Sequence, residues 1–328
     1  MLRELTVRHC RFQLKAPFRI SRGVRYATEV LIVQLRQGDK IGRGQCVPYA
    51  RYGESLASVI AQIEALREEL GAGMGRDELQ WCLAPGAARN ALDAALWDLE
   101  SQLTGIPVYT QLGCPPARSL TTALTVGIDT PEHMEQAAAR LGNAALVKIK
   151  VDADHPAARI EAVRRAVPNA RMIVDPNESW NIDLLHDLQP VLQRAGVDLL
   201  EQPLPADADD ALLDYTGSIP VCADEACHVS ADLPRLRGRY HAVNIKLDKT
   251  GGLTEAWRLL HAARADGFTI MVGCMVCSSL GIAPALEIAR HASFVDLDGP
   301  FLLERDDADG ITFEHGRLIP PPPGFWGE

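Results

Sequence analysis

Five short apolar segments in the middle of the chain decide the fold: ALVKIKV (145–151), RMIVD (171–175), VDLLEQ (197–202), IPVCADE (219–225) and AVNIK (242–246). Segments with helical spacing separate them, and TALTVGI (122–128), FTIMVG (268–273) and SFVDLD (293–298) extend the series on both sides. Strands that alternate with helices predict a parallel sheet. Eight such strands predict a closed barrel. An open, doubly wound sheet is the alternative, but no G-x-G-x-x-G follows the first strand.

The chain before this series has a different pattern. Its first ~50 residues read as strands, and the Gly-, Pro- and Tyr-rich segment 42–55 reads as a loop. Residues 56–70 have helical spacing, and 87–105 predicts a strong amphipathic helix that stops at Gly105. The first third of the chain is therefore predicted to be α+β.

Composition excludes several classes of protein. Of 328 residues, 47% are hydrophobic and 23% are charged, which argues against a disordered chain or a fibre. The net charge is −10 without a basic stripe, so nucleic acid is not an expected partner. No apolar run reaches the ~18 residues that would cross a bilayer, and the first residues lack a signal-peptide core. We expect a cytoplasmic protein that makes no use of a membrane.

Eight cysteines are predicted to be reduced thiols, mostly in the core. Cys274 and Cys277 have C-x-x-C spacing. A zinc site there is disfavoured because the sequence has no second pair and no nearby histidine cluster.

Charged residues stand at the carboxyl ends of the apolar strands, which is where barrels form active sites. Buried parallel strands are otherwise almost wholly apolar, so charges at six strand ends point to a shared site. The charged residues are Lys148, Lys150, Asp175, Glu201, Asp224, Glu225, Lys246, Asp296 and Asp298.

Three of these carboxylates predict a metal site. Asp175, Glu201 and Asp224 end three consecutive strands, so their side chains can converge. Carboxylates confined together cannot all stay ionised without a cation. Oxygen donors without histidine or cysteine select Mg²⁺ or Mn²⁺ over zinc. Asn177 is expected to support these ligands.

The lysines predict acid–base chemistry. Lys148 and Lys150 are two residues apart on a strand and point to the same side, so each is expected to lower the pKa of the other, and a nearby cation would add to this. A lysine with a lowered pKa can act as a general base. Lys246 lies four strands on, across the barrel mouth, with Lys249 as its rival. A structural ion pair with Asp175 or Glu201 is the alternative role for Lys148.

The motifs VKIK, VDPNESW, LLEQPLP, CADE and NIKLDKTGG together resemble the enolase superfamily, and the lysine pattern resembles its muconate-lactonizing-enzyme subgroup. Residues 87–113 resemble the signature helix of that superfamily's capping domain. The resemblance implies an α/β fold: a modified (β/α)7β TIM-like barrel at 116–305, an N-terminal α+β capping domain at 1–115, and a C-terminal segment, 306–328, that returns to the capping domain.

Within the subgroup, PYARYGES (48–55), CADEACH, VGCMVC and DLDGP resemble the dipeptide epimerases that act on L-Ala-D/L-Glu in murein peptide recycling. This resemblance implies Mg²⁺ on the carboxylate triad and a small dipeptide as substrate. The same resemblance assigns acid–base roles to Lys150 and Lys246, and charge stabilisation to Lys148. Self-association is common for this fold family, so a homo-oligomer is possible.

The resemblance also assigns substrate contacts. Asp296 and Asp298 would bind the free ammonium of the dipeptide, although a helix cap or a solvated edge is the alternative. Arg22, or else Arg25, would pair with the glutamate side chain. Further candidates are Tyr52, in a loop expected to close over the substrate, and Thr125, with Glu225 as a supporting residue.

Some positions depart from the family pattern. Gln45 stands where the family commonly has Glu, Pro176 where a small residue is usual, and Cys277 and Ser278 in a stretch that often carries Glu. These departures concern loop details and substrate preference more than the reaction type. Other reactions on the same site are the nearest alternatives, namely o-succinylbenzoate synthesis, N-acylamino-acid racemisation and cycloisomerisation. A non-catalytic binding protein on this scaffold is a remote alternative.

Overall fold

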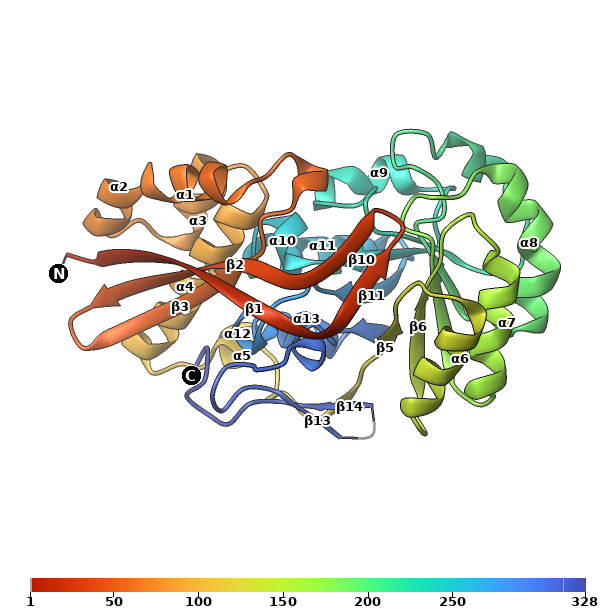
Figure 1. Cartoon of the computed structure of the whole chain (residues 1–328). Coiled ribbons are helices and arrows are strands. Elements are labelled where there is room, and N and C mark those ends of the chain that lie inside the picture. Colours follow the sequence, from red (N-terminus) through yellow and green to blue (C-terminus); the bar gives the residue numbers. More distant parts are fainter. Residues whose placement is uncertain (1, 315) are drawn as a thin grey trace.

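The computed structural model describes residues 2–314 and 316–328, which form three sheets. An N-terminal antiparallel sheet of three strands packs against helices, and its two long strands form a hairpin that reaches across to the barrel (Figure 1). The elements of this capping part are β1 (Glu4–Ile20), β2 (Gly23–Gln37), β3 (Lys40–Cys46), η1 (Ala50–Tyr52), α1 (Leu56–Glu64), α2 (Arg67–Ala72), α3 (Arg76–Cys82), α4 (Ala87–Thr104) and α5 (Val108–Gln111).

The predicted barrel is confirmed, with all eight expected strands in sequence order. The amide of Ala123 donates to the carbonyl of Val295 over 2.7 Å, which joins the first strand to the last and closes the sheet. The strands are β5 (Leu124–Val126), β6 (Leu146–Lys150), β7 (Arg171–Asp175), β8 (Leu199–Glu201), β9 (Val221–Ala223), β10 (Ala242–Ile245), β11 (Thr269–Gly273) and β12 (Phe294–Asp296).

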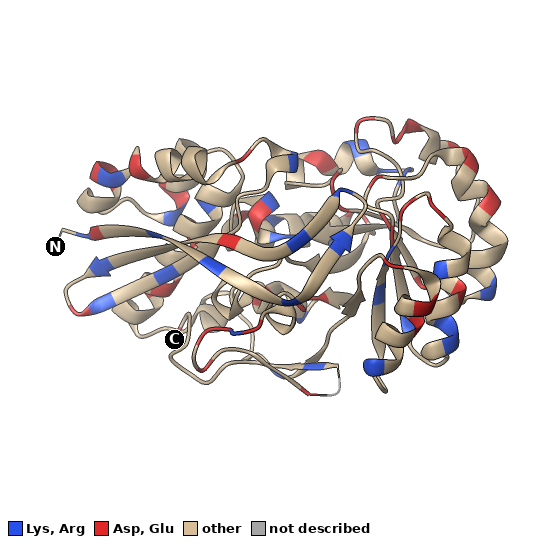
Figure 2. Ribbon diagram, viewed as in Figure 1, with Lys and Arg blue, Asp and Glu red and all other residues tan. Residues whose placement is uncertain are grey.

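Helices surround the barrel, and their Lys and Arg residues are interspersed with Asp and Glu (Figure 2). The crossover between β8 and β9 contains only a 3₁₀ turn, so the alternation with helices is less regular than the sequence predicts. These elements are α6 (Pro131–Arg140), α7 (Pro156–Ala166), α8 (Ile182–Arg194), η2 (Asp210–Asp214), η3 (Ser230–Asp232), α9 (Leu233–Leu236), α10 (Leu247–Thr250), α11 (Leu253–Ala265), α12 (Ser279–Ile282), α13 (Leu286–Ala289) and η4 (Pro300–Leu302). None of the helices in the described residues is both long and apolar enough to span a membrane.

A third small sheet brings the chain end back. Strands β13 (Thr312–Glu314) and β14 (Arg317–Ile319) pair with β4 (Leu120–Thr121). The indole of Trp326 then donates to the carbonyls of Arg43 and Ala94, over 3.0 and 3.2 Å, so the C-terminal end lies against the capping helix α4.

A single layer of apolar side chains fills the bottom of the barrel. The position of this layer determines at which height the later residues of each strand point into the barrel. Seven of the eight strands contribute one buried side chain each to this layer, and Ala123, directly before β5, contributes the eighth. Successive side chains on a strand alternate sides, so the residue two positions later points inward again, one level higher. The layer consists of Ala123, Leu146, Ile173, Leu199, Cys222, Ala242, Met271 and Phe294.

Two expectations for the capping part were wrong in detail. Residues 42–46 belong to β3 and not to a loop. Gly42 and Gly44 are there for close packing, because a Cβ at either position would lie 2.1 Å from a carbonyl oxygen of α4. Helix α4 is also not simply amphipathic, since it is buried on nearly all sides between the sheet and the barrel.

The buried polar residues of α4 explain its pattern, because they hydrogen-bond to the barrel. Asp93 accepts from the hydroxyl and the amide of Thr254, over 2.6 and 3.0 Å, and Asn90 donates to Asp248 over 2.8 Å. These bonds fix the capping part on the segment that directly follows β10.

Candidate active site

The predicted site residues occupy the two levels directly above the apolar layer. Lys148, Asp175, Glu201 and Asp224 each lie two positions after a layer residue. Lys150 and Lys246 lie four positions after one, nearer the mouth. The strand periodicity therefore delivers all of these side chains to the inside of the barrel at its carboxyl end.

Ammonium and carboxylate groups alternate at the centre of this site. The Lys148 Nζ lies 2.7 Å from both Glu201 Oε2 and Asp296 Oδ2, and 3.1 Å from Asp175 Oδ2. The Lys150 Nζ lies 2.5 Å from Asp175 Oδ2. All five residues are at most 8% exposed.

Lys246 stands on the opposite wall. It follows β10, which is four strands from β6 in an eight-stranded barrel, so Lys150 and Lys246 face each other across the mouth. The Lys246 Nζ contacts Asp224 Oδ2 at 2.7 Å. Gly273 makes room for it, because a Cβ there would lie 2.9 Å from Lys246 Cε.

Lys249 occupies a different place from Lys246. Its Nζ donates to Asp224 Oδ1 over 2.7 Å and to the carbonyl of Asn244 over 2.9 Å, and it is 1% exposed. It therefore lies behind Asp224 and fixes that carboxylate, whereas Lys246 lines the cavity.

The pKa values of the carboxylates differ because their neighbours differ. Burial opposes ionisation of Asp175, but the ammonium groups of Lys150 and Lys148 outweigh it and lower its pKa to about 2. Burial, followed by repulsion from Asp175, raises the pKa of Glu201 to about 7.

The predicted lowering of the pKa does not occur for Lys148. Burial does disfavour the Lys148 ammonium, but Asp296, Glu201 and Asp175 outweigh it and raise its pKa well above the usual value. Asp224 and Glu201 likewise raise the pKa of Lys246. The direct contacts of the Lys148 ammonium with three carboxylates, at 2.7 to 3.1 Å, outweigh the repulsion between neighbouring lysines.

The donor set suits a hard divalent cation. Asp175, Glu201 and Asp224 supply only oxygen, the donor that Mg²⁺ prefers, and are at most 1% exposed. They come from three consecutive strands. Within residues 2–314 and 316–328, no group of acidic, histidine or cysteine side chains is already arranged to ligate an ion. The ammonium groups of Lys148 and Lys246 lie 2.7 Å from carboxylate oxygens of Glu201 and Asp224, respectively. A bound cation would replace these ammonium contacts.

Neighbouring amides hold the carboxylates in place. The backbone amide of Asn177 donates to Asp175 Oδ1 over 2.9 Å, and its side chain donates to Asp175 Oδ2 over 3.2 Å. Asn244 donates to Glu201 Oε1 over 2.8 Å, and Gln202 accepts from the amide of Asp224 over 2.9 Å.

Sequence reasoning missed Asn244 and Gln202. The sequence did contain an indication of Asn244. It is a polar residue within a buried strand, two positions before Lys246 and on the same face.

The cavity lies between the barrel mouth and two segments of the capping part, the β1–β2 hairpin tip and the loop 47–54. It has a volume of about 70 Å³. Its lining residues are Phe18, Ile20, Arg22, Arg25, Tyr49, Tyr52, Lys150, Asn177, Asp224, Lys246, Cys274, Met275 and Val276. The capping part therefore closes over the two lysines.

Glu178 fastens both capping segments to the barrel and was not found from the sequence. It forms a bidentate pair with Arg51, at 2.7 Å for both contacts, and also accepts from Arg22 at 3.2 Å. Arg22 additionally pairs with Glu225 at 2.8 Å. These contacts join residues of the capping part and the barrel that are far apart in the sequence. No spacing in the sequence therefore indicates them.

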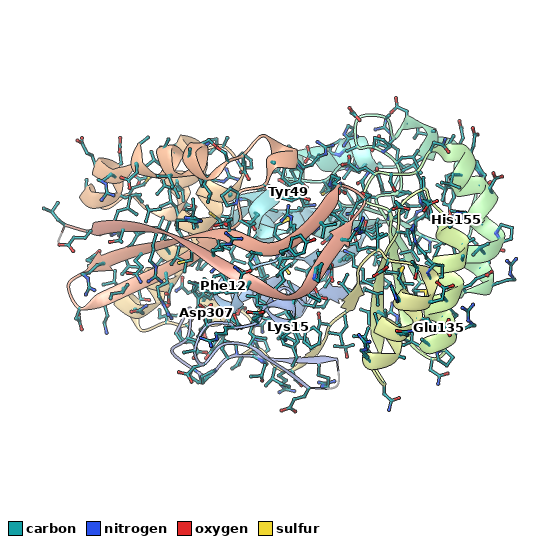
Figure 3. All side chains as sticks on the ribbon, viewed as in Figure 1. Phe12, Lys15, Tyr49, Glu135, His155 and Asp307 are labelled. Carbon is teal, nitrogen blue, oxygen red and sulfur yellow. The ribbon has the colours of Figure 1, made fainter. Side chains whose placement is uncertain are left out.

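The two candidate arginines differ in what they contact. Arg22 is committed to Glu225 and Glu178, whereas Arg25 lies over the ring of Tyr49, 4.9 Å from its centre. No acidic side chain among the described residues pairs with Arg25. Figure 3 shows Tyr49 between the capping sheet and the barrel.

The remaining candidates also take defined places. Tyr52 lines the cavity and packs edge-on against Tyr49 and His228. Thr125 does not line the cavity, but its amide donates to Asp298 Oδ2 over 2.7 Å. Asp296 keeps one buried oxygen, Oδ1, without a hydrogen-bond partner among the described residues.

Two residues that depart from the family pattern, Gln45 and Ser278, are hydrogen-bonded to each other. The Gln45 side chain donates to the Ser278 hydroxyl over 2.6 Å and accepts from the Ser278 amide over 3.0 Å. The Ser278 hydroxyl itself donates to Asp307 Oδ2 over 2.6 Å, so the carboxylate of a Glu at position 45 could not replace the amide donor of Gln45 there.

Comparison with known proteins shows to which family the chain belongs. Residues 2–113 match the N-terminal domain of the mandelate racemase and muconate lactonizing enzyme family, and residues 129–325 match the enolase C-terminal domain-like family. The chain belongs to the enolase superfamily. Its relatives described below are an epimerase and a racemase, which are isomerases acting on amino-acid derivatives.

Two relatives of known function cover nearly the whole chain. The L-Ala-D/L-Glu epimerase of Escherichia coli K12 is 47% identical over 93% of this chain and 96% of its own length. The N-acetyl-D-glutamate racemase of a Pseudoalteromonas species is 43% identical over 91% of this chain and 95% of its own. The two differ in whether the amino group of the substrate is free.

Solved structures are also similar. An enolase family member from Agrobacterium tumefaciens with homology to dipeptide epimerases, with bound sodium and L-Ala-L-Glu, superposes with a TM-score of 0.97 at 45% identity, covering 99% of this chain and all of that one. The dipeptide epimerase of Enterococcus faecalis V583, complexed with Mg and L-Leu-L-Tyr, has a TM-score of 0.90 at 28% identity, covering 98% of each chain.

Proposed function

We propose that this protein is a Mg²⁺-dependent dipeptide epimerase that acts on L-Ala-D/L-Glu by 1,1-proton transfer at the α-carbon of the C-terminal residue. The observation that carries the proposal is the pair Lys150 and Lys246 on opposite walls of one cavity, beside a buried carboxylate triad. Two acid–base groups on opposite faces of one carbon are what inversion by proton transfer needs.

The position of each residue indicates its role in the proposed reaction. One lysine takes the α-proton from one face, and the other returns a proton to the opposite face. Asp175, Glu201 and Asp224 would hold Mg²⁺, with Mn²⁺ as an alternative ion for the same donors. When bound, the cation would stabilise the negative charge of the enediolate and offset the carboxylates that keep the lysines protonated. Lys148 adds a fixed positive charge beside the reacting carboxylate.

The recognition of a free amine rests on Asp296 and Asp298. The unpartnered Asp296 Oδ1 is a buried acceptor. Burial, followed by repulsion from Asp296, raises the pKa of Asp298 to about 7, so an added ammonium would favour its ionised form. An N-acylated substrate has no ammonium to offer this pair.

We expect Asp298→Asn to raise the KM for L-Ala-L-Glu by about tenfold to 100-fold, as the loss of one charged hydrogen bond predicts. The α-proton exchange of N-acetylglutamate, if present, should change much less. Steady-state kinetics on both substrates check this. The exposed Asp129→Asn variant is the control, and equal losses on both substrates would contradict the role.

The glutamate side chain is assigned to Arg25 in preference to Arg22. Arg25 lines the cavity without an acidic partner, whereas Arg22 is already paired twice. This reverses the order of preference that the sequence suggested.

We expect Arg25→Met to raise the KM for L-Ala-L-Glu by about tenfold or more, because a charge-assisted pair is lost. The KM for the neutral L-Ala-L-Gln should stay within about threefold. A parallel loss on both dipeptides would instead show that Arg25 only shapes the cavity.

Proton exchange in D₂O with Mg²⁺, followed by NMR, tests the function as a whole. The panel contains L-Ala-L-Glu, other L-Xaa-L-Glu dipeptides, N-acetyl- and N-succinyl amino acids and the o-succinylbenzoate precursor. Exchange confined to free-amine dipeptides supports the epimerase. Exchange confined to N-acyl substrates would favour racemisation, which the relative from Pseudoalteromonas makes the second candidate.

The proposal includes a cytoplasmic role in recycling murein peptides, in keeping with eight free cysteines. A homo-oligomer stays a prediction.

A further inference from the structure

Gln202 directly follows the triad residue Glu201 and has an unusual backbone conformation. Its φ is +35°, in the left-handed region that residues with a side chain rarely adopt, and the residue is fully buried. Such a conformation persists only where the surrounding contacts over-determine it. The contacts that hold Gln202 therefore indicate what the residue does.

The side-chain amide of Gln202 uses its whole hydrogen-bonding capacity. Its Oε1 accepts from the backbone amides of Asp224 and Ala226, over 2.9 and 3.1 Å. Its Nε2 donates to the carbonyl of Leu204 over 2.9 Å and to the hydroxyl of Tyr240 over 2.8 Å. Because such an amide has two donor hydrogens and one oxygen with two lone pairs, these four bonds fix its orientation. The amide thus joins the segment after β8 to the turn after β9, which carries Asp224.

The backbone of Gln202 adds two more links. Its amide donates to the carbonyl of Cys222 over 2.8 Å, and its carbonyl accepts from the amide of Glu178 over 2.9 Å. Glu178 is the residue that fastens Arg22 and Arg51 of the capping part. Gln202 therefore connects its own strand with β9 and with the segment after β7.

Tyr240 fixes the orientation of the Gln202 amide from the other end. Tyr240 lies buried between α9 and β10, and its hydroxyl donates to Asp209 Oδ2 over 2.7 Å. A hydroxyl has a single hydrogen, so Tyr240 acts as the acceptor toward Gln202. Nε2 of the amide must then face Tyr240, which leaves Oε1 for the backbone amides of Asp224 and Ala226. Both ends of this chain of hydrogen bonds impose the same orientation.

Two arginines hold Asp209 as the acceptor. Asp209 is 2% exposed, and Arg235 Nη1 lies 3.2 Å from both of its carboxylate oxygens. Arg239 Nη1 lies 3.4 Å from Asp209 Oδ1. Arg235 also donates to the carbonyl of Ala226 over 2.8 Å, on the turn that Gln202 holds. The chain of hydrogen bonds therefore runs from partly exposed guanidinium groups to the backbone of a triad residue.

We propose that Gln202 is a positioning residue for the metal site: it makes Glu201 and the turn that carries Asp224 one rigid unit, which Tyr240 and Asp209 hold from outside the barrel. The Asp224 carboxylate lies 2.7 Å from the ammonium groups of both Lys246 and Lys249, so a small shift of its backbone changes these contacts. The consequence for Mg²⁺ rests on the proposed function, whereas the rigidity of the turn does not.

Tyr240→Phe tests the rigidity of the turn in the metal-free, full-length protein. The substitution removes the acceptor for Gln202 and leaves the carboxylates and the lysines unchanged. We expect the backbone amides of Asp224 and Ala226 to exchange with D₂O about threefold to tenfold faster, the scale of one lost hydrogen bond. Mass spectrometry of the peptide that spans residues 223–228 measures this exchange. Equal acceleration in the peptide that spans residues 171–175 would indicate a loss of overall stability and would overturn the proposal.

Mg²⁺ affinity is the second measurement, by calorimetry. We expect the Kd for Mg²⁺ to rise about threefold to tenfold in Tyr240→Phe, and about tenfold to 100-fold in Gln202→Met, the usual range for residues that hold metal ligands. The kcat of Tyr240→Phe for L-Ala-L-Glu at saturating Mg²⁺ should stay within about twofold of wild type, because the reacting groups are unchanged. Tyr240→Phe keeps the test valid even if Gln202→Met does not fold.

Tyr215→Phe is the matched control. The Tyr215 hydroxyl also lies within hydrogen-bond distance of two acceptors, Gln189 Oε1 at 3.2 Å and the carbonyl of Ile219 at 3.0 Å. Its loss should change neither the exchange of residues 223–228 nor the Kd for Mg²⁺.

The outcomes separate this role from the proposed function. Unchanged exchange in Tyr240→Phe would overturn the rigid unit, and faster exchange with an unchanged Kd for Mg²⁺ would overturn its link to the metal. If no dipeptide is a substrate, the proposed function fails, and the exchange and the Kd still decide the role of Gln202.

Discussion

Epimerisation of L-Ala-L-Glu should fall by about 10³-fold in either Lys150→Met or Lys246→Met, within the range for loss of a general acid or base. The two variants should nevertheless differ in what they retain. Each keeps one lysine, on one face of the substrate, and each should still exchange the α-proton of one epimer with solvent. The epimer that still exchanges its α-proton should be L-Ala-D-Glu in one variant and L-Ala-L-Glu in the other.

The measurement is α-proton exchange in D₂O from each pure epimer, followed by NMR, together with Mg²⁺ binding by calorimetry. Binding of Mg²⁺ shows that the triad is intact. Lys40→Met removes an exposed lysine far from the cavity and serves as the control. If both variants exchanged both epimers at the wild-type rate, the two-lysine mechanism would be wrong.

The second large effect concerns stability. We expect Lys148→Met, in the presence of a chelator, to lose about 3–5 kcal/mol of unfolding free energy, the usual cost of leaving buried charges uncompensated. The Lys148 ammonium contacts Asp175, Glu201 and Asp296 within 3.1 Å, so its removal leaves three buried carboxylates facing each other.

Mg²⁺ should restore more stability to this variant than to the wild type, because a ligand that binds only the folded state stabilises it and here also supplies the missing charge. Chemical denaturation with and without Mg²⁺ measures both the stability that the variant loses and the stability that Mg²⁺ restores. A variant as stable as the wild type without Mg²⁺ would show that these carboxylates are not held ionised by Lys148.

The periodicity of the strands made most of the site predictable. A residue two positions after a buried layer residue must point into the barrel, so Lys148, Asp175, Glu201 and Asp224 could be assigned to one place from sequence alone. The alternation of strands with helices fixed the carboxyl end as the place where they meet. Whether each residue performs its assigned role stays a prediction.

Other features could not be read from local patterns. Gly42 and Gly44 indicated a loop, yet they lie in β3, where the close approach of α4 excludes a side chain. The pairing of Arg22 with Glu178 and Glu225 joins residues more than 150 positions apart, and it decides which arginine remains free for substrate.

The sequence by itself therefore determined the barrel, its eight strands and the set of side chains at its mouth, because each depends on a period of two along one strand. Only the tertiary structure decided how the capping part closes the cavity and which charges neutralise each other. These depend on distances between separate segments, and pKa values follow those distances. The Lys148 pKa was predicted with the wrong sign for that reason: its nearest charges are carboxylates from three other strands.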